Sequence, residues 1–242
     1  MQGNLYIVGV GPGDPDLLTI KALKILEKCP VWLAPKAHKD GESTALSIVS
    51  THIATDDKKI VSHRFPMKPV HREKQADETL LKAWQEAAQV VLEQLSAGLD
   101  VAFPTLGDPA IYSTGFYLCE ALAETGFRGE IEVIPGVSSI GTTAASAVTP
   151  LCLGDERLLV LPATFENGEV ASLLKIVDVI VFMKVYRVLE KMIEILEREN
   201  LIDNATLVER AGCSDERVWT NIREAVPENL HYFSTLIVRR KS

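Results

Sequence analysis

The chain has 242 residues, 47% of them hydrophobic, which is enough for one large globular domain or two compact ones. Its 33 acidic and 25 basic residues give a net charge of -8, which disfavours nucleic-acid binding because that affinity comes mostly from phosphate neutralisation. The apolar runs are far shorter than the roughly 20 residues that cross a bilayer, and the first residues lack the basic segment of a signal peptide, so we expect no membrane span and a cytoplasmic location.

Hydrophobic periodicity divides the chain into short strands that alternate with helices, the pattern of an α/β protein. In chain order, strands are expected at residues 5–10, 31–34, 101–103, 131–134, 158–161, 177–184, 205–209, 218–221 and 234–239. Helices are expected at about residues 17–26, 43–49, 80–95, 111–124, 141–148 and 188–199. The opening strand, helix and strand predict a parallel sheet with a right-handed crossover.

One long stretch, residues 36–74, is only weakly periodic, and such stretches are usually functional or mobile. The alternation begins again in the second half of the chain, and no low-complexity linker separates the halves. We therefore expect two α/β domains, at residues 1–113 and 114–242, with a ligand-binding cleft between them.

The four cysteines, Cys29, Cys119, Cys152 and Cys213, are scattered along the chain. They have neither the paired spacing of a zinc site nor a Cys-x-x-Cys motif. We therefore expect four buried thiols in a reducing compartment, and no metal ion.

The tripeptide Gly-Asp-Pro occurs twice, at Gly13–Pro15 and Gly107–Pro109, each time between a strand and a helical pattern. Glycine gives the turn its freedom, aspartate caps a helix and proline fits the first helical position. Each copy is therefore expected to open a helix at the end of a strand, where open α/β sheets bind ligands.

The first loop is not a dinucleotide-binding fingerprint. Asp14 stands where Gly-x-Gly-x-x-Gly requires its third glycine, and the second strand ends in Pro35 rather than in an acidic residue for a ribose. Pro12 removes an amide from the turn, and no Gly-Lys-Ser/Thr motif is present for a P-loop. A nicotinamide-dependent oxidoreductase is therefore disfavoured.

Five motifs in a fixed order point to a known family. They are Gly9–Gly13, Leu106–Pro109, Val133–Ser139, Val181–Lys184 and Val208–Gly212. With these motifs the chain resembles, over essentially its full length, the tetrapyrrole methylase family of S-adenosylmethionine-dependent enzymes. Five segments are most similar to the members that methylate C20 of precorrin-2 or of its cobalt-containing counterpart, cobalt-factor II: Phe65–Met67, Leu106–Pro109, Gly154–Arg157, Leu161–Thr164 and Glu209–Gly212.

The resemblance implies that S-adenosylmethionine binds in the cleft, that S-adenosylhomocysteine is the product and that the protein is a homodimer. The implied cofactor-binding residues are Pro12, Leu106, Gly107, Asp108, Ile111, Ser138, Ser139, Met183, Ala211, Ser234 and Thr235. Small residues in this set allow close approach, and hydroxyl and backbone groups suit the polar parts of the cofactor.

The segment expected to bind the tetrapyrrole is more basic than the rest of the chain. Residues 36–74 hold eight Lys or Arg against five acidic residues, a local charge of +3 in a chain of -8. Tetrapyrroles of this class carry many carboxylates, which Lys and Arg bind by charge-assisted hydrogen bonds, although a solvated charged loop would have the same composition. The candidate substrate-binding residues are Lys36, His63, Arg64, Lys68, Lys184 and Arg187.

The C20 carbon of such a ring is enamine-like, so the enzyme is expected to supply alignment and a dry cleft. Tyr112 is the candidate catalytic residue, while Tyr112, His63 and water all remain open as acceptors of the C20 proton. The alternatives are methylation at another corrin position, methylation of ribosomal RNA and non-catalytic tetrapyrrole binding. The acidic net charge disfavours RNA, and Pro35, where uroporphyrinogen III methylases have Asp, disfavours C2 and C7 methylation.

Overall fold

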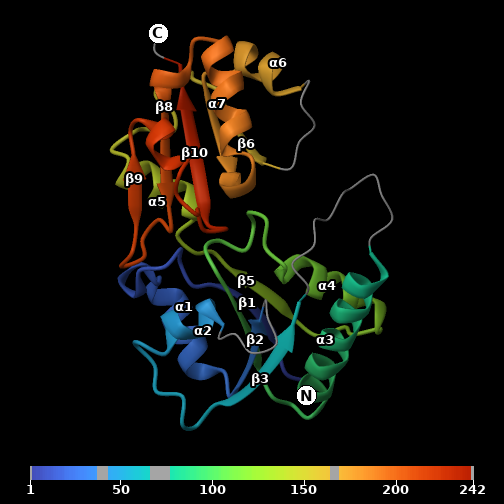
Figure 1. Ribbon diagram of the computed structural model, residues 1–242. Coiled ribbons are helices and arrows are strands. Elements are labelled where there is room, and N and C mark those ends of the chain that lie inside the picture. The colour runs from blue at the N-terminus through green and yellow to red at the C-terminus, as the bar shows by residue number, and fades with distance from the viewer. Residues whose placement is uncertain (1, 37–42, 66–76, 164–168, 241–242) are drawn as a thin grey trace. The chain divides into compact units, whose positions relative to one another are not determined.

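The computed structural model of the protein consists of two compact units, residues 1–138 and 139–242, each built around one five-stranded sheet (Figure 1). The structure describes residues 2–36, 43–65, 77–163 and 169–240. The division falls after Ser138 rather than near Ser113, because strand β5 (Ile131–Ile134) pairs with β1 (Leu5–Gly9) in the first sheet.

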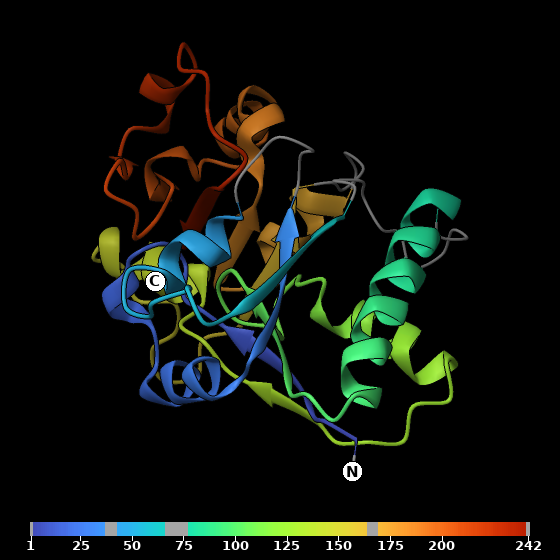
Figure 2. The same ribbon diagram turned by 90° about the horizontal axis from the view of Figure 1, so that it is seen from below.

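The first sheet is parallel throughout, with strand order β3-β2-β4-β1-β5. Its other strands are β2 (Val31–Lys36), β3 (Lys59–Arg64) and β4 (Val101–Thr105). Helices α1 (Ile20–Lys28) and α2 (Thr44–Val49) cover one face, and α3 (Glu78–Ser96) and α4 (Gly115–Glu124) cover the other (Figure 1 and Figure 2). The alternating strands and helices of the first half are thereby confirmed.

The core of the first unit follows from the alternation of side chains along a strand. Leu5 and Ile7 of β1 pack with α3 and α4, whereas Tyr6 and Val8 pack with α1 and α2. Because both faces of the sheet are covered, its central strands are continuous apolar runs rather than alternating ones. Trp32 is wholly buried, and its indole N–H donates to Leu26 O at 3.1 Å.

Two elements were not expected from the sequence. Strand β3 lies within residues 36–74 and has a single neighbour, β2, so Lys59, Ser62 and Arg64 remain exposed and the apolar pattern is weak. Helix α6 (Glu169–Ile176) has eight residues, about two turns, which are too few to show a helical period.

The two Gly-Asp-Pro turns differ. Asp14 accepts a hydrogen bond from Asp16 N at 2.9 Å and Pro15 begins a short 3₁₀ helix, as predicted. At the second copy the prediction of a helix start is wrong, because α4 begins only at Gly115. Asp108 instead closes a local turn, since its Oδ1 accepts from Ala110 N at 2.8 Å.

The second unit has a mixed sheet with strand order β6-β7-β10-β8-β9. The strands are β6 (Leu158–Pro162), β7 (Val179–Met183), β8 (Ala205–Glu209), β9 (Arg217–Trp219) and β10 (Ser234–Arg239). Strand β10 is antiparallel to both β7 and β8. Helices α6 and α7 (Leu189–Arg198) share a core with this sheet, and α5 (Ser139–Ser146) contacts β10.

The cysteines do not all have the expected environment. Cys29 is buried, Cys119 and Cys213 are half-buried, and Cys152 is exposed, so the expectation of four buried thiols is wrong for Cys152. Burial raises the pKa of Cys29 to about 12 and that of Cys119 to about 11, which keeps both thiols protonated near neutral pH. Among the described helices, none is both long and apolar enough to cross a bilayer.

Helix α5 ends in a strained residue. Val148 has a φ of 48° and is 90% exposed, while Val148 N donates to Ala145 O and Thr149 N to Ala144 O, the bonds of a Schellman motif. A side chain in the left-handed region costs roughly 1–2 kcal/mol. We expect Val148→Gly to raise the free energy of unfolding by about 1 kcal/mol in urea denaturation. Ala145→Gly is the control and should lower it by about as much; an unchanged or lower stability of Val148→Gly would contradict the assignment of strain.

Candidate active site

The candidate residues of the first unit collect at one edge of its sheet. The strands are parallel, so their carboxyl ends meet at this edge, where open α/β sheets bind ligands. The predicted residues at or just beyond the strand ends are Pro12 after β1, Lys36 in β2, His63 and Arg64 in β3, Leu106, Gly107, Asp108, Ile111 and Tyr112 after β4, and Ser138 after β5.

Three loops at this edge meet backbone to backbone at Gly9, Gly11, Gly107 and Gly136, which we call the glycine junction. Gly107 N donates to Gly11 O at 2.7 Å, and Gly11 N donates to Gly107 O at 3.3 Å. A Cβ atom on Gly136 would lie 2.4 Å from Gly107 O, and one on Gly9 would lie 2.6 Å from Gly136 N. These backbone contacts leave no room for a side chain, so glycine is required at both positions.

Asp108 joins two of these loops. Its Oδ2 accepts a hydrogen bond from Gly136 N at 2.9 Å, while its Oδ1 accepts from Ala110 N within its own loop. The carboxylate therefore ties the loop after β4 to the loop after β5. Each oxygen has a second lone pair, so these bonds leave acceptor capacity for a ligand.

Tyr112 follows this loop in an unusual backbone conformation. Its φ is 52° and its side chain is 50% exposed. Next to it, Ser113 Oγ lies 3.0 Å from Thr105 Oγ1 and accepts from Gly115 N at 3.0 Å. Strained non-glycine residues of this kind persist where the surroundings hold them, and they are frequent at functional sites. Burial raises the pKa of the Tyr112 phenol above its ordinary value.

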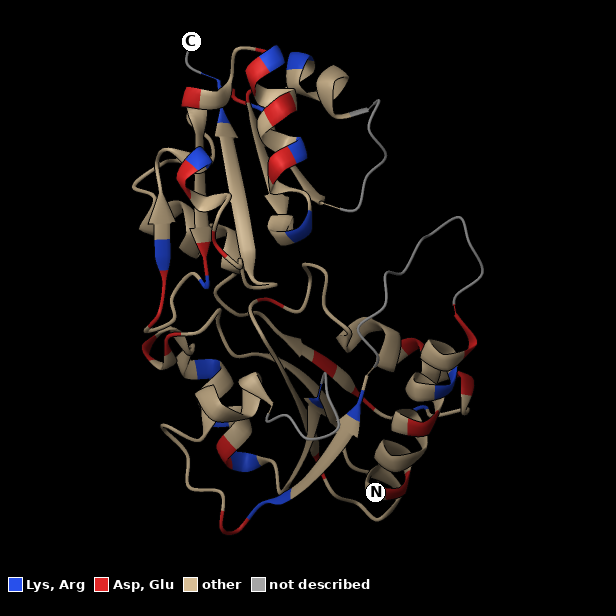
Figure 3. Ribbon diagram, in the orientation of Figure 1, with Lys and Arg blue, Asp and Glu red and all other residues tan. Residues whose placement is uncertain are grey.

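The basic candidates at the ends of β2 and β3 face opposite sides of the sheet. Lys36 and Arg64 are direct partners in the parallel register and so share one face, whereas His63 lies on the other. Figure 3 marks Lys and Arg positions in blue on the ribbon. His63 Nε2 is 2.8 Å from Ala83 O in α3. Because a carbonyl only accepts, His63 Nε2 is the donor in this bond, and Nδ1 is the remaining ring nitrogen. Lys68 lies outside the described residues.

The candidates of the second unit also share a sheet edge. Met183 at the end of β7 pairs with Thr235, and Glu209 at the end of β8 pairs with Ser234, so the start of β10 lies between these two strand ends. Ala211 follows in the turn after β8 and is buried. Ser139 begins α5, four residues before Thr143.

Two left-handed residues flank the start of β10. Lys184 has a φ of 66° and its N–H donates to Ser234 O at 2.7 Å, while Arg210 has a φ of 52° and its N–H donates to Phe233 O at 2.7 Å. The Oγ of fully buried Ser234 has no hydrogen-bond partner among the described residues, and the same holds for Thr143 Oγ1. Unsatisfied buried hydroxyls are costly and rare, so they fit a ligand with polar groups, as the adenosine and amino-acid parts of S-adenosylmethionine have.

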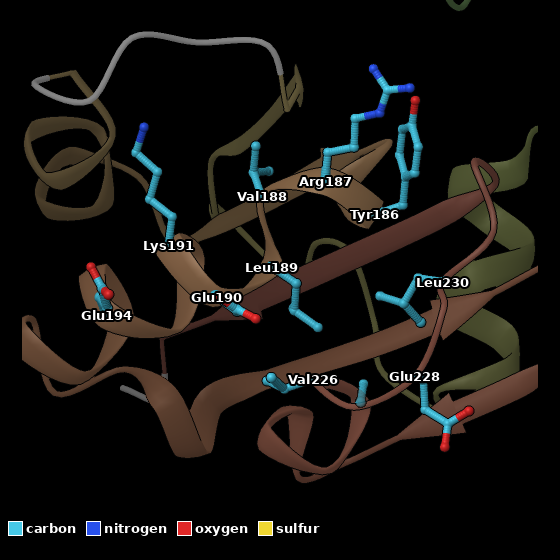
Figure 4. A pocket seen from close by; sticks show the side chains of 11 residues that line it. Tyr186, Arg187, Val188, Leu189, Glu190, Lys191, Glu194, Val226, Glu228 and Leu230 are labelled. Carbon is cyan, nitrogen blue, oxygen red and sulfur yellow. The ribbon is translucent and has the colours of Figure 1, made fainter.

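Lys184 and Arg187 lie beside aromatic rings. Lys184 Nζ is 5.2 Å from the ring centre of Tyr232, and the Arg187 guanidinium carbon is 5.0 Å from that of Tyr186. Figure 4 shows Tyr186 and Arg187 extending side by side from the rim of a hollow of about 490 Å³. This hollow is separate from the candidate cofactor residues at the strand ends, because its lining does not include Met183, Ala211, Ser234 or Thr235.

Sequence reasoning missed part of this arrangement. Ser113 and Thr143 carried no motif: Ser113 is identified by its contacts with Thr105 and Gly115, and Thr143 by a buried hydroxyl without a partner among the described residues. Within the described ranges, no three His, Cys, Asp or Glu side chains are grouped closely enough to hold a metal ion.

A parallel sheet with a glycine junction at its carboxyl edge, followed by a mixed sheet in which the buried Ser234 hydroxyl has no partner among the described residues, defines a two-unit α/β protein. The chain belongs to the tetrapyrrole (corrin/porphyrin) methylase family, whose model matches residues 4–226.

Curated relatives match over nearly the whole chain. The protein is 34% identical to the cobalt-precorrin-2 C(20)-methyltransferase of Salmonella typhimurium, with 100% of this chain and 98% of that protein covered. It is 33% identical to the precorrin-2 C(20)-methyltransferase of a Sinorhizobium species, with 98% and 95% covered.

Solved structures of related enzymes have the same fold. The cobalt precorrin-4 methyltransferase CbiF matches with a TM-score of 0.74 at 21% identity, covering 98% of this chain and 94% of that one. A uroporphyrin-III C-methyltransferase from Thermus thermophilus, solved with S-adenosylhomocysteine, matches with a TM-score of 0.65 at 22% identity, covering 98% of each chain. The expected α/β architecture of this family is confirmed.

Proposed function

We propose that this protein transfers the methyl group of S-adenosylmethionine to C20 of precorrin-2 or its cobalt-containing counterpart in cobalamin biosynthesis. The proposal rests on the sequence identity of 34% and 33% to two C(20)-methyltransferases, over 100% and 98% of this chain. Two features support it: the glycine junction, which allows close backbone approach, and the Ser234 and Thr143 hydroxyls, which are buried and have no hydrogen-bond partner in the described part of the chain.

When bound, S-adenosylmethionine supplies an electrophilic methyl group on its sulfonium sulfur. The proposed contacts in the first unit are Pro12, Leu106, Gly107, Asp108, Ile111 and Ser138, and those in the second are Ser139, Met183, Ala211, Ser234 and Thr235. In the first unit, Asp108 and the glycine junction hold the loop in a single shape, so that less ordering has to accompany binding.

The tetrapyrrole is proposed to meet the basic residues. Lys36 and Arg64, side by side in the register, form one candidate pair for its acetate and propionate groups, and Lys184 and Arg187 form another. Lys68 is proposed only from the sequence.

Tyr112 is proposed to orient the ring as a hydrogen-bond donor. Its pKa is raised by burial, so the phenol stays protonated near neutral pH and is a poor base. After transfer, the C20–H bond breaks, its electron pair returns to the ring, and the proton goes to His63 Nδ1 or to water. We also propose a cytoplasmic homodimer, from the family resemblance; light scattering should then give twice the 26.6 kDa mass of the chain.

The activity is tested by anaerobic incubation with S-adenosylmethionine and either metal-free sirohydrochlorin reduced to precorrin-2 or its cobalt complex. Mass spectrometry should detect one added methyl group on the ring and an equal amount of S-adenosylhomocysteine. The ring with the higher kcat/KM identifies the natural substrate. Binding of a ring without any methyl transfer would instead indicate a non-catalytic tetrapyrrole-binding protein.

Arg64→Ala should raise the KM for the tetrapyrrole by about tenfold, because a charge-assisted hydrogen bond contributes roughly 1.5–3 kcal/mol. Affinity for S-adenosylhomocysteine, measured by calorimetry, should stay within about twofold. Lys59→Ala is the matched control, since Lys59 is exposed at the other end of the same strand and its Nζ donates to Gln94. Equal effects of the two substitutions on the tetrapyrrole KM would argue against a ring-binding role for Arg64.

A further inference from the structure

A buried carboxylate stands at the edge of the second sheet. Glu209 is the last residue of β8, is 3% exposed and pairs in register with Ser234 on one side and Arg217 on the other. It belongs to the Val208–Gly212 motif, yet none of the roles discussed so far uses its side chain.

The Glu209 carboxylate receives hydrogen bonds from two directions. Arg217 Nε donates to Oε2 at 2.7 Å, and the backbone N–H of His231 donates to Oε1. Burial opposes the charge, but the bonds from Arg217 and His231 outweigh it and lower the pKa of Glu209. The group is therefore an anion with both oxygens engaged.

These bonds hold the segment that leads into β10. The N–H of Phe233 donates to His231 Nδ1 at 3.1 Å, and Phe233 O accepts from Arg210 N at 2.7 Å. Ser234 follows immediately. Glu209 is thus connected, through His231 and Phe233, to both the buried Ser234 hydroxyl and the left-handed turn that carries Ala211.

We propose that Glu209 is a positioning residue that sets the geometry of Ser234 and Ala211 for binding of S-adenosylmethionine. This inference rests on the proposed function. Two observations point to a ligand here rather than to a purely structural ion pair: the Ser234 Oγ is buried without a partner among the described residues, and Lys184 and Arg210 hold strained backbone on either side of it.

A stability role alone accounts poorly for the arrangement. Removing charges from water is costly, and well-packed apolar residues are often as stabilising as a buried ion pair. An ion pair with fixed directions does, however, define the position of the segments that it joins. Arg217 also pairs with Glu228, which is far more exposed. Within the described ranges, the Glu228 side chain makes no hydrogen bond to His231 or Phe233.

Glu209→Gln keeps the size of the side chain and one carbonyl acceptor but removes the charge. In calorimetry it should raise the Kd for S-adenosylhomocysteine by about tenfold or more, and the KM for S-adenosylmethionine should rise in parallel. The KM for the tetrapyrrole should stay within about twofold. Glu228→Gln is the matched control, because it removes the other carboxylate partner of Arg217, and it should leave all three values unchanged.

The outcomes separate this inference from the proposed function. If the unmodified protein does not bind S-adenosylhomocysteine, the proposed function fails. If it binds and folded Glu209→Gln binds equally well, or loses affinity no more than Glu228→Gln does, the positioning role is overturned. If Glu209→Gln does not fold, Arg217→Lys is used instead, because it keeps the positive charge but loses the Nε hydrogen bond to Glu209. The same selective loss of cofactor affinity is expected. Unchanged cofactor affinity in this variant would overturn the positioning role.

Discussion

Asp108→Ala should weaken S-adenosylhomocysteine binding by at least about tenfold in calorimetry. The substitution removes two hydrogen bonds to the carboxylate, one from the part-buried Gly136 N–H and one from the exposed Ala110 N–H. A hydrogen bond to a charged group contributes about 1.5–3 kcal/mol. The loop after β4 would then no longer be tied to the loop after β5. Cofactor affinity falls because the loop has to be ordered again on binding.

The other Gly-Asp-Pro copy provides the control for this experiment. Among the described residues, the Asp14 carboxylate accepts a hydrogen bond only from Asp16 N, two positions away in an exposed turn. Asp14→Ala should therefore change cofactor affinity by no more than about twofold. A similar loss in both variants would mean that the two turns are equivalent, and Asp108→Ala with normal affinity would remove this residue from the site.

Gly136→Ala should lower the free energy of unfolding by about 2–3 kcal/mol and abolish measurable cofactor binding. The new Cβ would lie 2.4 Å from Gly107 O and 2.8 Å from the carbonyl carbon of Gly9. Both are backbone atoms, so no side-chain rotation relieves the clash and the loops must separate. Urea denaturation and calorimetry measure the two effects.

Gly126→Ala separates steric conflict from backbone strain. Gly126 has a φ of 84°, but a Cβ there would meet nothing within 4 Å. Alanine should cost about 1 kcal/mol through strain alone and leave cofactor affinity unchanged. If Gly136→Ala is no more destabilising than Gly126→Ala, the prediction that the glycine junction has no room for a Cβ atom is wrong.

Much of the fold was predictable because its signals are local. Strand β1 is a continuous apolar run, and α3 ends at Ser96, next to the predicted end at residue 95, with Gly98 at a φ of 81° just beyond it. Edge strand β3 was missed because an edge strand is half exposed and its apolar pattern is diluted. The start of α4 was misplaced because the Asp108 carboxylate bonds Gly136, a partner 28 residues away, instead of capping a helix.

The candidate site was predictable to the extent that it follows from topology. The ends of parallel strands meet at one edge, so residues after β1, β4 and β5 had to come together. The glycine junction and the Glu209 bonds could not be foreseen, because both join residues that are far apart in the sequence. Gly11 and Gly107 are 96 residues apart, and Glu209 and His231 are 22 residues apart. Two signals for Glu209 were available in the sequence: it lies in the Val208–Gly212 motif, and it is a charged residue that ends the apolar run of β8.

The position of the new methyl group tests the proposed function most directly. The protein is incubated anaerobically with S-adenosylmethionine carrying a ¹³C-labelled methyl group and the preferred ring, and the product is studied by ¹³C NMR. We expect one labelled methyl group, bonded to C20, together with loss of the C20 proton. Label at any other carbon, or no label in either ring, would contradict C20 methylation by this protein.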